Sequence, residues 1–310
     1  MRRRGFGSHD FGCPDAPMIT VLFALGAACS NALNMITQHI ASTSDPGHTK
    51  GWQFVRYLVS NPLWLFGWVA LGGSFLFQAL ALHNGQMSVV QPILVTELVF
   101  ALVLRRLWIR QQIRNVTWWA AAITCGSLAL FVAVSEPTGG HVDPTSSAWV
   151  SATIAAGGAA AILALVGSRG SPVRRAAALG AATAILWALV ATFIKAMTDT
   201  LTQFGFFGMF AHWPVYALIV VSILAELLDQ TALHVGPLSV SQPFIVIVDP
   251  MVSIVLSVWI FAEVFTENPF RLAVGIVSFA VMCAAAAVLA RTTPATMAPG
   301  SARPHPPGRS

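Results

Sequence analysis

The sequence has 310 residues, of which 56% are hydrophobic and 9% are charged, and its mean hydropathy is +0.71. A soluble domain of this size carries charge on close to a quarter of its residues, so a soluble globular fold is excluded. A membrane span needs about 20 mostly apolar residues, and this chain supplies many such runs. The net charge of +5 is therefore interpreted as a signal of membrane topology, and we expect no nucleic-acid partner.

The chain divides into a polar tail at 1–17, a membrane unit at 18–135, a connecting segment at 136–168, a second membrane unit at 169–291 and a Pro-rich tail at 292–310. The composition of the last segment predicts disorder. Met1 and Met18 are alternative translation starts, because Met18 stands directly before the first apolar run. The sequence predicts nine helices, at 18–42, 62–84, 86–107, 115–135, 148–168, 174–197, 213–235, 238–261 and 270–291.

The distribution of basic residues predicts the orientation of these helices. Twelve of the 17 lysines and arginines fall in the loops and tail of one side, namely Lys50, Arg56, Arg105, Arg106, Arg110, Arg114, Arg169, Arg174, Arg175, Arg291, Arg303 and Arg309. Arg2, Arg3, Arg4 and Arg271 fall on the other side, and Lys195 lies within a helix. We therefore expect the N-terminus outside and the C-terminus in the cytoplasm of a cell whose inner membrane holds the protein.

A twelve-residue phrase occurs twice along the chain. Residues 81–92 read ALHNGQMSVVQP, and residues 232–243 read ALHVGPLSVSQP, at a spacing of 151 residues. The flanking runs at 32–41 and 188–197 also resemble each other. Helices 1–4 therefore correspond to helices 6–9, with helix 5 as a connector. Matched helices lie five positions apart in the chain order of helices. Because five is an odd number, the two halves are predicted to have opposite topology. Inverted repeats are typical of secondary transporters, whose sites lie between the halves near the membrane midplane.

Each half carries a carboxylate near the middle of the helix that follows the phrase, Glu97 in the first and Asp249 in the second. A charge at that depth costs about 2.5–3.5 kcal/mol on insertion scales. Protonation removes part of that cost, so we interpret the pair as the charged centre of a solute site and as a coupling point for protons. A permanently protonated pair that bonds across the repeat interface is the structural alternative.

Other polar side chains within apolar runs are further candidates for this site. Helix 7 places Glu226 and Asp229 within one turn, and helix 1 places Asn31, Asn34 and Gln38 on one face. The remaining candidates are Gln91 and Gln242, the matched glutamines of the phrase, and Trp187, which could stack on an organic solute. Pro92, Pro243 and Pro250 are expected to interrupt helices 3 and 8, because proline removes a backbone hydrogen bond. We expect His39 and Lys195, near helix ends, to extend toward the membrane surface, and most tryptophans to form an interfacial belt.

Motifs of ATP-driven pumps and intramembrane hydrolases are missing from the sequence. We find no GxxxxGK[ST], HExxH or GxSxG pattern, and the four cysteines show no metal-binding spacing. We therefore predict no enzymatic activity and no cofactor.

The chain resembles the drug/metabolite transporter superfamily and its EamA-like and NIPA-like group. The resemblance lies in residues 81–92 and 232–243 and in the apolar helix that follows each Gln-Pro. The resemblance covers roughly residues 18–291. Halves in that group commonly close the proline helix with Gly-Glu, where this sequence has Leu104-Arg105 and Ala262-Glu263. The resemblance implies two inverted helical halves and the export of a small organic solute, or Mg²⁺ transport as in eukaryotic NIPA proteins.

The sequence thus predicts an all-α membrane transporter that works by alternating access without ATP. Its site is expected between helices 1, 3, 6, 7 and 8, its partners are a small solute or cation and the lipid bilayer, and a homodimer is one assembly open to it. A Mg²⁺ carrier is the first alternative, because carboxylate and amide oxygens suit that ion. A membrane scaffold or enzyme subunit without transport is the second.

Overall fold

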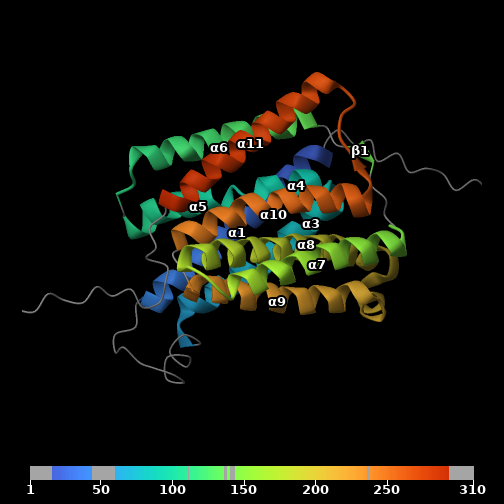
Figure 1. Ribbon diagram of the computed structural model, residues 1–310, viewed down its shortest axis with the longest axis horizontal. Helices are drawn as coiled ribbons and strands as arrows, with labels where there is room; N and C mark the ends of the chain where they lie inside the picture. Colours follow the sequence, from blue (N-terminus) through green and yellow to red (C-terminus); the bar gives the residue numbers. More distant parts are fainter. Residues whose placement is uncertain are drawn as a thin grey trace, which may run out of the picture.

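The structure, a computed structural model, describes residues 16–43, 60–110, 112–135, 138–139, 144–235 and 238–292. Within these ranges nearly all residues are helical, and the helices lie side by side in an elongated bundle (Figure 1). Two short segments, β1 (Thr138–Gly139) and β2 (Glu263–Val264), pair in antiparallel fashion. We call the end of the bundle that holds this pair the strand end.

The long helices follow the apolar runs of the sequence. They are α1 (Ala16–Thr43), α3 (Pro62–Asn84), α6 (Asn115–Ser135), α7 (Ser146–Gly167), α8 (Pro172–Gly208), α9 (Trp213–Val235), α10 (Leu238–Phe261) and α11 (Pro269–Thr292). Among the described residues, eight helical spans are long and apolar enough to cross a membrane. The 23-residue helix α9 is not among the eight, although its length is comparable. The chain is therefore an all-α protein with the helices of a multi-pass membrane protein.

Local sequence determines where several of these helices begin. Asn61 accepts a hydrogen bond from the Leu63 amide at 2.9 Å, and Pro62 occupies the first turn of α3. Ser171 and Pro172 play the same two roles at the start of α8. A side-chain acceptor before the helix and a proline in its first turn both compensate for amides that lack helical partners.

The predicted third helix is divided in two. The structure has α4 (Met87–Leu94), a turn at Val95 and Thr96, and then α5 (Glu97–Leu104), which runs into a π-helical turn, η1 (Arg105–Ile109). The expected interruption by Pro92 is therefore present two residues after the proline. In contrast, α10 continues through Pro243 and Pro250, so the expected break in the eighth helix was wrong.

Helix α8 is longer than the predicted 174–197. It continues to Gly208, with a change of direction at Gly205, whose φ is +73°, and is followed by the short turn η2 (Met209–Ala211). The polar residues Asp199, Thr200, Thr202 and Gln203 led the sequence prediction to end the helix early. Helical backbone satisfies its own hydrogen bonds, so the helix extends past the apolar run.

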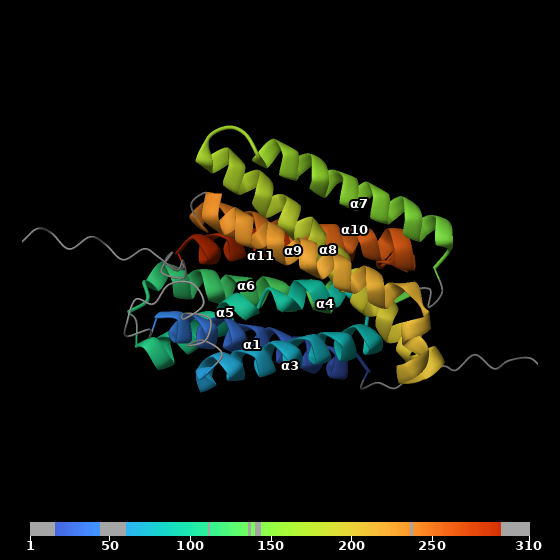
Figure 2. The same cartoon turned by 90° about the horizontal axis from the view of Figure 1, so that it is seen from below.

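The packing of the helices repeats along the chain. Helix α1 packs on α3 and on α5, while α8 packs on α9 and on α10. Helix α6 packs on α11, and α4 packs on α10. Helix α7 lies against α8, and Figure 2 shows these two helices close together at their connecting turn and spread apart toward the strand end.

The main core lies where α4, α8 and α10 meet. Its fully buried side chains include Met87, Ile93, Phe193, Ile194 and Phe261. Small residues bring helices into close contact at several points, and a Cβ atom on Gly180 of α8 would lie 2.7 Å from the carbonyl oxygen of Ser241 in α10. Close approach at small residues is the usual means of packing helices in membranes.

Candidate functional site

The two predicted mid-span carboxylates lie in the interior of the bundle on different helices. Glu97 is the first residue of α5, and its Oε2 accepts a hydrogen bond from Nδ2 of Asn31 in α1 at 2.5 Å. Asp249 lies in the middle of α10, and its Oδ1 accepts a hydrogen bond from the Ser253 hydroxyl at 3.3 Å. The two carboxyl groups are close enough for the charge of Glu97 to act on Asp249. The structure therefore joins Glu97 to Asn31 by a direct hydrogen bond and leaves Asp249, bonded to Ser253, within electrostatic range of Glu97.

The turn between α4 and α5 explains why Glu97 points to α1. The Thr96 hydroxyl donates to the carbonyl oxygen of Ile93 at 2.7 Å, and the amides of Val95 and Thr96 bond three residues back. These shorter bonds tighten the backbone and place Glu97 at the start of a new helix. Negative side chains are favoured at helix starts, where amides lack partners. The arrangement is a mid-membrane carboxylate at an interrupted helix.

The polar face of α1 continues beyond Asn31. Nε2 of Gln38 donates to Oδ1 of Asn34 at 2.6 Å, and both side chains are partly buried. Asn34 and Gln38 lie against Gly67 of α3. A Cβ atom added to Gly67 would come within 3.0 Å of the Gln38 side chain and within 3.5 Å of the Asn34 carbonyl oxygen. Asn34 and Gln38 thus bond to each other beside α3, whereas Asn31 bonds to Glu97 of the carboxylate pair.

The two acids of α9 stand apart from this centre. Glu226 is exposed on the surface of the bundle, while Asp229 is partly buried and its Oδ1 has no hydrogen-bond partner among the described residues. Helix α9 packs mainly on α8. The structure therefore groups Glu226 with Asp229 and leaves both on a helix that packs away from α1.

The remaining candidates fall at different places. Gln91 of α4 is 3% exposed, and its Nε2 has no partner among the described residues. Gln242 is partly buried near the start of α10, and Trp187 packs against the main core from α8. The side chains of His39 and His234 lie outside the described part of the structure.

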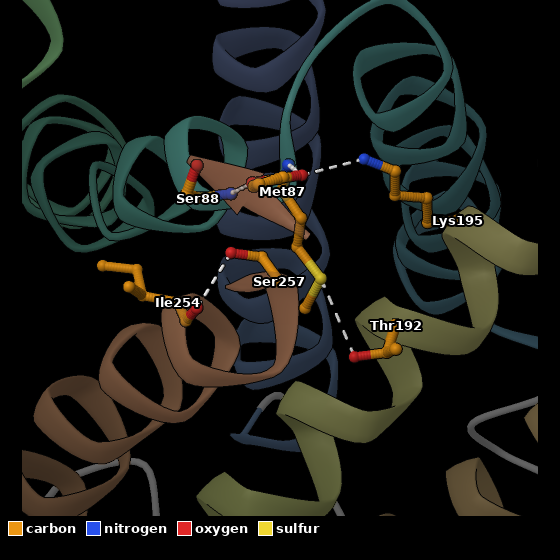
Figure 3. Close-up of polar contacts among 7 residues, drawn as sticks. Met87, Ser88, Thr192, Lys195, Ile254 and Ser257 are labelled. Atoms are coloured by element: carbon orange, nitrogen blue, oxygen red, sulfur yellow. Dashed lines mark hydrogen bonds and ion pairs between the residues drawn. The ribbon is translucent and has the colours of Figure 1, made fainter. Parts of the chain in front are cut away.

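A second charged group, which the sequence analysis did not select, lies at the strand end. The buried Glu263 carboxylate accepts hydrogen bonds from the amides of Met87 and Ser88 at 2.8 and 3.0 Å, and from Nζ of Lys195 at 2.9 Å. Figure 3 shows Lys195 turned toward Met87 and Ser88, with Thr192 one turn away. Nζ of Lys195 also lies 4.6 Å from the ring centroid of Phe261. The amine of Lys195, which was expected to extend toward the membrane surface, thus has a buried carboxylate partner.

The partners of Glu263 keep it ionised. Burial acts to raise its pKa, but the charge of Lys195 and the hydrogen bonds from Ser88 and Lys195 act in the opposite direction, and the net result is a pKa below the ordinary 4.5. A carboxylate at the start of a helix also benefits from the positive end of the helix dipole. Glu263 thus joins α4 of the first half to α8 and to the end of α10.

A cavity of about 780 Å³ opens at the strand end between α7, α8 and α9. Four aromatic side chains pack against one another along it, with ring centroids 5.0 to 5.8 Å apart: Trp149, Phe193, Trp213 and Phe261. Asp199, Thr200 and Gln203 supply polar atoms to its lining. This volume and this mixture of apolar walls with a few polar groups are typical of sites for small organic molecules.

The sequence predicted that most tryptophans form an interfacial belt. In the structure Trp149 is 9% exposed and packs within the aromatic group. The signal that would have revealed this cavity is the placement of these rings at matching ends of consecutive helices. Among the described residues, no group of three or more His, Cys, Asp or Glu side chains is arranged to hold a metal ion.

The chain is 27% identical over 290 residues to an uncharacterized protein of Corynebacterium glutamicum, with 92% of this chain and 99% of that protein covered. No family model matches the sequence, and no solved structure matches it. The similarity thus extends over nearly the full length of both proteins.

Proposed function

We propose that the chain is a secondary transporter of the drug/metabolite transporter superfamily, which moves a small organic solute across the cytoplasmic membrane by alternating access. The observation that carries the proposal is the carboxylate pair, with Glu97 at the interrupted α4–α5 helix, bonded to Asn31 and within electrostatic reach of Asp249. Interrupted helices beside a mid-membrane charge are the usual construction of a transporter site. Charged residues at this depth are expensive and are retained for function.

The matching contacts of the two halves support an inverted repeat. The contacts of α1 with α3 and α5 correspond to those of α8 with α9 and α10. Arg110 and Ala262 both adopt left-handed backbone, with φ of 53° and 52°, and the same number of residues separates them as separates Glu97 from Asp249. The proposed repeat therefore pairs Ala262 with Arg110, where the sequence comparison set Ala262-Glu263 against Leu104-Arg105.

The proposed orientation places the strand end outside the cell. The described basic residues at the opposite end include Arg114, Arg169, Arg174 and Arg291, whereas at the strand end Arg271 lies in the first turn of α11. An excess of basic residues in short loops favours the cytoplasmic side. The aromatic cavity would then face the outside, and its size suits an organic solute.

Transport of Mg²⁺ is the second candidate, and the carboxylate pair is the observation that favours it. Mg²⁺ binds through one or two carboxylates and retains several waters, so Glu97 and Asp249 are sufficient protein ligands. The aromatic cavity has no role in that function. A test must therefore include both classes of solute.

The proposal is tested by flux into proteoliposomes that contain the purified protein. Uptake of amines, amino acids and Mg²⁺ is measured with and without a pH gradient. We expect a solute whose uptake depends on the gradient, and a loss of at least tenfold in Glu97→Gln and in Asp249→Asn. Glu226→Gln, which changes an exposed acid of α9, is the matched control and should retain uptake. Normal flux in both mid-span variants would refute the proposal, and Mg²⁺ uptake alone would select the second candidate.

A further inference from the structure

A row of buried polar groups connects the carboxylate pair to the strand end. Asp249, Ser253 and Ser257 follow one another at four-residue spacing on α10, which places them on one face of the helix. Both serines are fully buried, at 0% exposure. The row rises by 1.5 Å per residue and therefore covers about 12 Å.

Helix α4 adds two more polar groups to this row. It packs on α10 and begins at the strand end, where α10 finishes, so the two helices are antiparallel. Ser88 and Gln91 of α4 lie three residues apart and are 0% and 3% exposed. From the strand end inward, Ser88 of α4 thus lies at the level of Ser257 of α10, and Gln91 lies at the level of Ser253.

The polar atoms of α4 in this row lack partners. The hydroxyl oxygen of Ser88 and Nε2 of Gln91 are buried and have no hydrogen-bond partner among the described residues. A buried polar group without a partner is costly, and in proteins such groups are usually satisfied by internal water. The Ser88 hydroxyl lies beside the Glu263 carboxylate, so Gln91 is the group of this row that most needs an internal water as a partner.

The Lys195–Glu263 pair lies at the outer end of the row. Glu263 accepts a hydrogen bond from the amide of Ser88, the first polar residue of the row on α4, and Ser257 lies six residues before Glu263 in the chain. Figure 3 shows Ser88, Ser257 and Lys195 around this point. The charged groups along the row in the described structure are Lys195 and Glu263 at one end and Asp249 with Glu97 at the other.

We propose that this row is a hydrated proton path from the strand end to Asp249, closed by the Lys195–Glu263 pair. The proposal rests on the proposed function, since it assigns the route of the coupling proton. A proton from water at the strand end passes along hydroxyl groups and waters, each of which accepts one proton and donates another, and arrives on the Asp249 carboxylate. For Ser257 this transfer requires its hydroxyl to turn away from the Ile254 carbonyl oxygen, to which it donates at 2.8 Å. Opening of the pair exposes the row to water, and the intact pair separates Asp249 from that side.

The path is tested by the reactivity of introduced cysteines, which requires no knowledge of the solute. In a background without Cys13, Cys29, Cys125 and Cys283, Ser257→Cys and Ser253→Cys are treated in liposomes with a charged methanethiosulfonate reagent. Leu256→Cys, at a site on the same helix that is 2% exposed in an apolar environment, is the matched control. The cysteine thiolate attacks the sulfur of the reagent and displaces methanesulfinate, and the thiolate forms in water and not in apolar surroundings.

We expect Ser257→Cys to react at least tenfold faster than Leu256→Cys, and Glu263→Gln to increase the rate at Ser257→Cys about tenfold without affecting the control. Lys195→Met breaks the same pair from its other side and should have the same effect if Glu263→Gln fails to fold. Equal rates at positions 256 and 257 in all backgrounds would overturn the path. If Ser257→Cys is labelled as expected but no solute flux is found in proteoliposomes, the proposed function is contradicted. If flux is found but Ser257→Cys is not labelled faster than Leu256→Cys, the proton path alone is contradicted.

Discussion

Glu263 shows how much one side chain contributes to the arrangement of this bundle. Its two oxygens accept bonds from the start of α4 and from Lys195 of α8. Removing one partner of a buried ion pair leaves the other charge without compensation, at a cost of about 3–5 kcal/mol.

We expect Glu263→Gln to lower the thermal unfolding temperature strongly in detergent, because the amide cannot balance the charge of Lys195. Thermal unfolding followed by tryptophan fluorescence is the measurement. Glu267→Gln, in the same connection but exposed, provides the control and should leave the unfolding temperature unchanged. Equal behaviour of the two variants would show that the pair does not stabilise the fold.

The same residue predicts a dependence of stability on pH. The pKa of Glu263 is lower in the folded protein than the ordinary 4.5, so the folded state favours the ionised form. Its contribution to stability is fully present above pH 4.5 and decreases as the pH falls through the folded-state pKa. Unfolding temperatures between pH 7 and pH 3 should therefore decline on the acid side in the native protein and decline less in Glu263→Gln.

Ala262 adopts a conformation that normally favours glycine. Its φ is +52°, and left-handed backbone costs about 1–2 kcal/mol for a residue with a Cβ. Ala262→Gly removes this strain, and because the side chain is exposed, no packing is lost. We expect a gain of about 1 kcal/mol, visible as a rise of a few degrees in the unfolding temperature. A decrease would show that the backbone at this position is not strained.

The sequence was sufficient to select Glu97 and Asp249, because a carboxylate in a long apolar run has few explanations. The polar face of α1 likewise contained Asn31, the residue that bonds Glu97. Glu263 was not selected, because its bond to Met87 joins residues 176 positions apart. Nothing in the local sequence indicates such a contact, although Ala262-Glu263 stands where the resemblance led us to expect Gly-Glu.

At the scale of elements, close contact between helices depends on glycine at defined positions. Gly180 of α8 faces the backbone of α10, where an added Cβ would meet the Ser241 carbonyl oxygen at 2.7 Å, whereas Gly158 of α7 has open space around it. Gly180→Ala should force α8 and α10 apart and destabilise the protein by about 1–3 kcal/mol. Gly158→Ala should be neutral or stabilising by up to about 1 kcal/mol, because alanine favours helix.

The comparison of these two variants by thermal unfolding separates packing from helix propensity. Both substitutions lie inside a helix and add the same methyl group. A similar effect of the two would contradict the close α8–α10 contact.

Hydropathy located the helices well, since the predicted ranges 62–84, 115–135, 213–235 and 238–261 coincide with α3, α6, α9 and α10. Hydropathy failed at the end of α8, where the helix continues through a polar segment. It also failed at Val95 and Thr96, where a helix breaks within an apolar run. Proline did not decide these breaks by itself. Pro92 precedes a turn, while Pro243 and Pro250 lie within a continuous α10, so the surrounding contacts determine the outcome.

At the scale of the whole molecule, the carboxylate pair lies between two ends of different character. The strand end holds the Lys195–Glu263 pair and the aromatic cavity, and the opposite end holds most of the described basic residues. A transporter that works by alternating access must open these ends in turn, with the carboxylate pair exposed first to one side and then to the other. The Lys195–Glu263 pair is closed in the structure, and its opening would belong to the state that faces outward.

The central claim is tested most directly by distances between spin labels at the two ends, measured by double electron–electron resonance in lipid nanodiscs. One pair joins Asn84→Cys to Asn268→Cys at the strand end, and the other joins Gln112→Cys to Arg169→Cys at the opposite end; all four sites are exposed. We predict two populations for each pair, with lengthening at one end accompanied by shortening at the other. The balance should shift with pH in the native protein and become insensitive to pH in Glu97→Gln/Asp249→Asn. A single distance for both pairs, unchanged by pH and by these substitutions, would contradict the account.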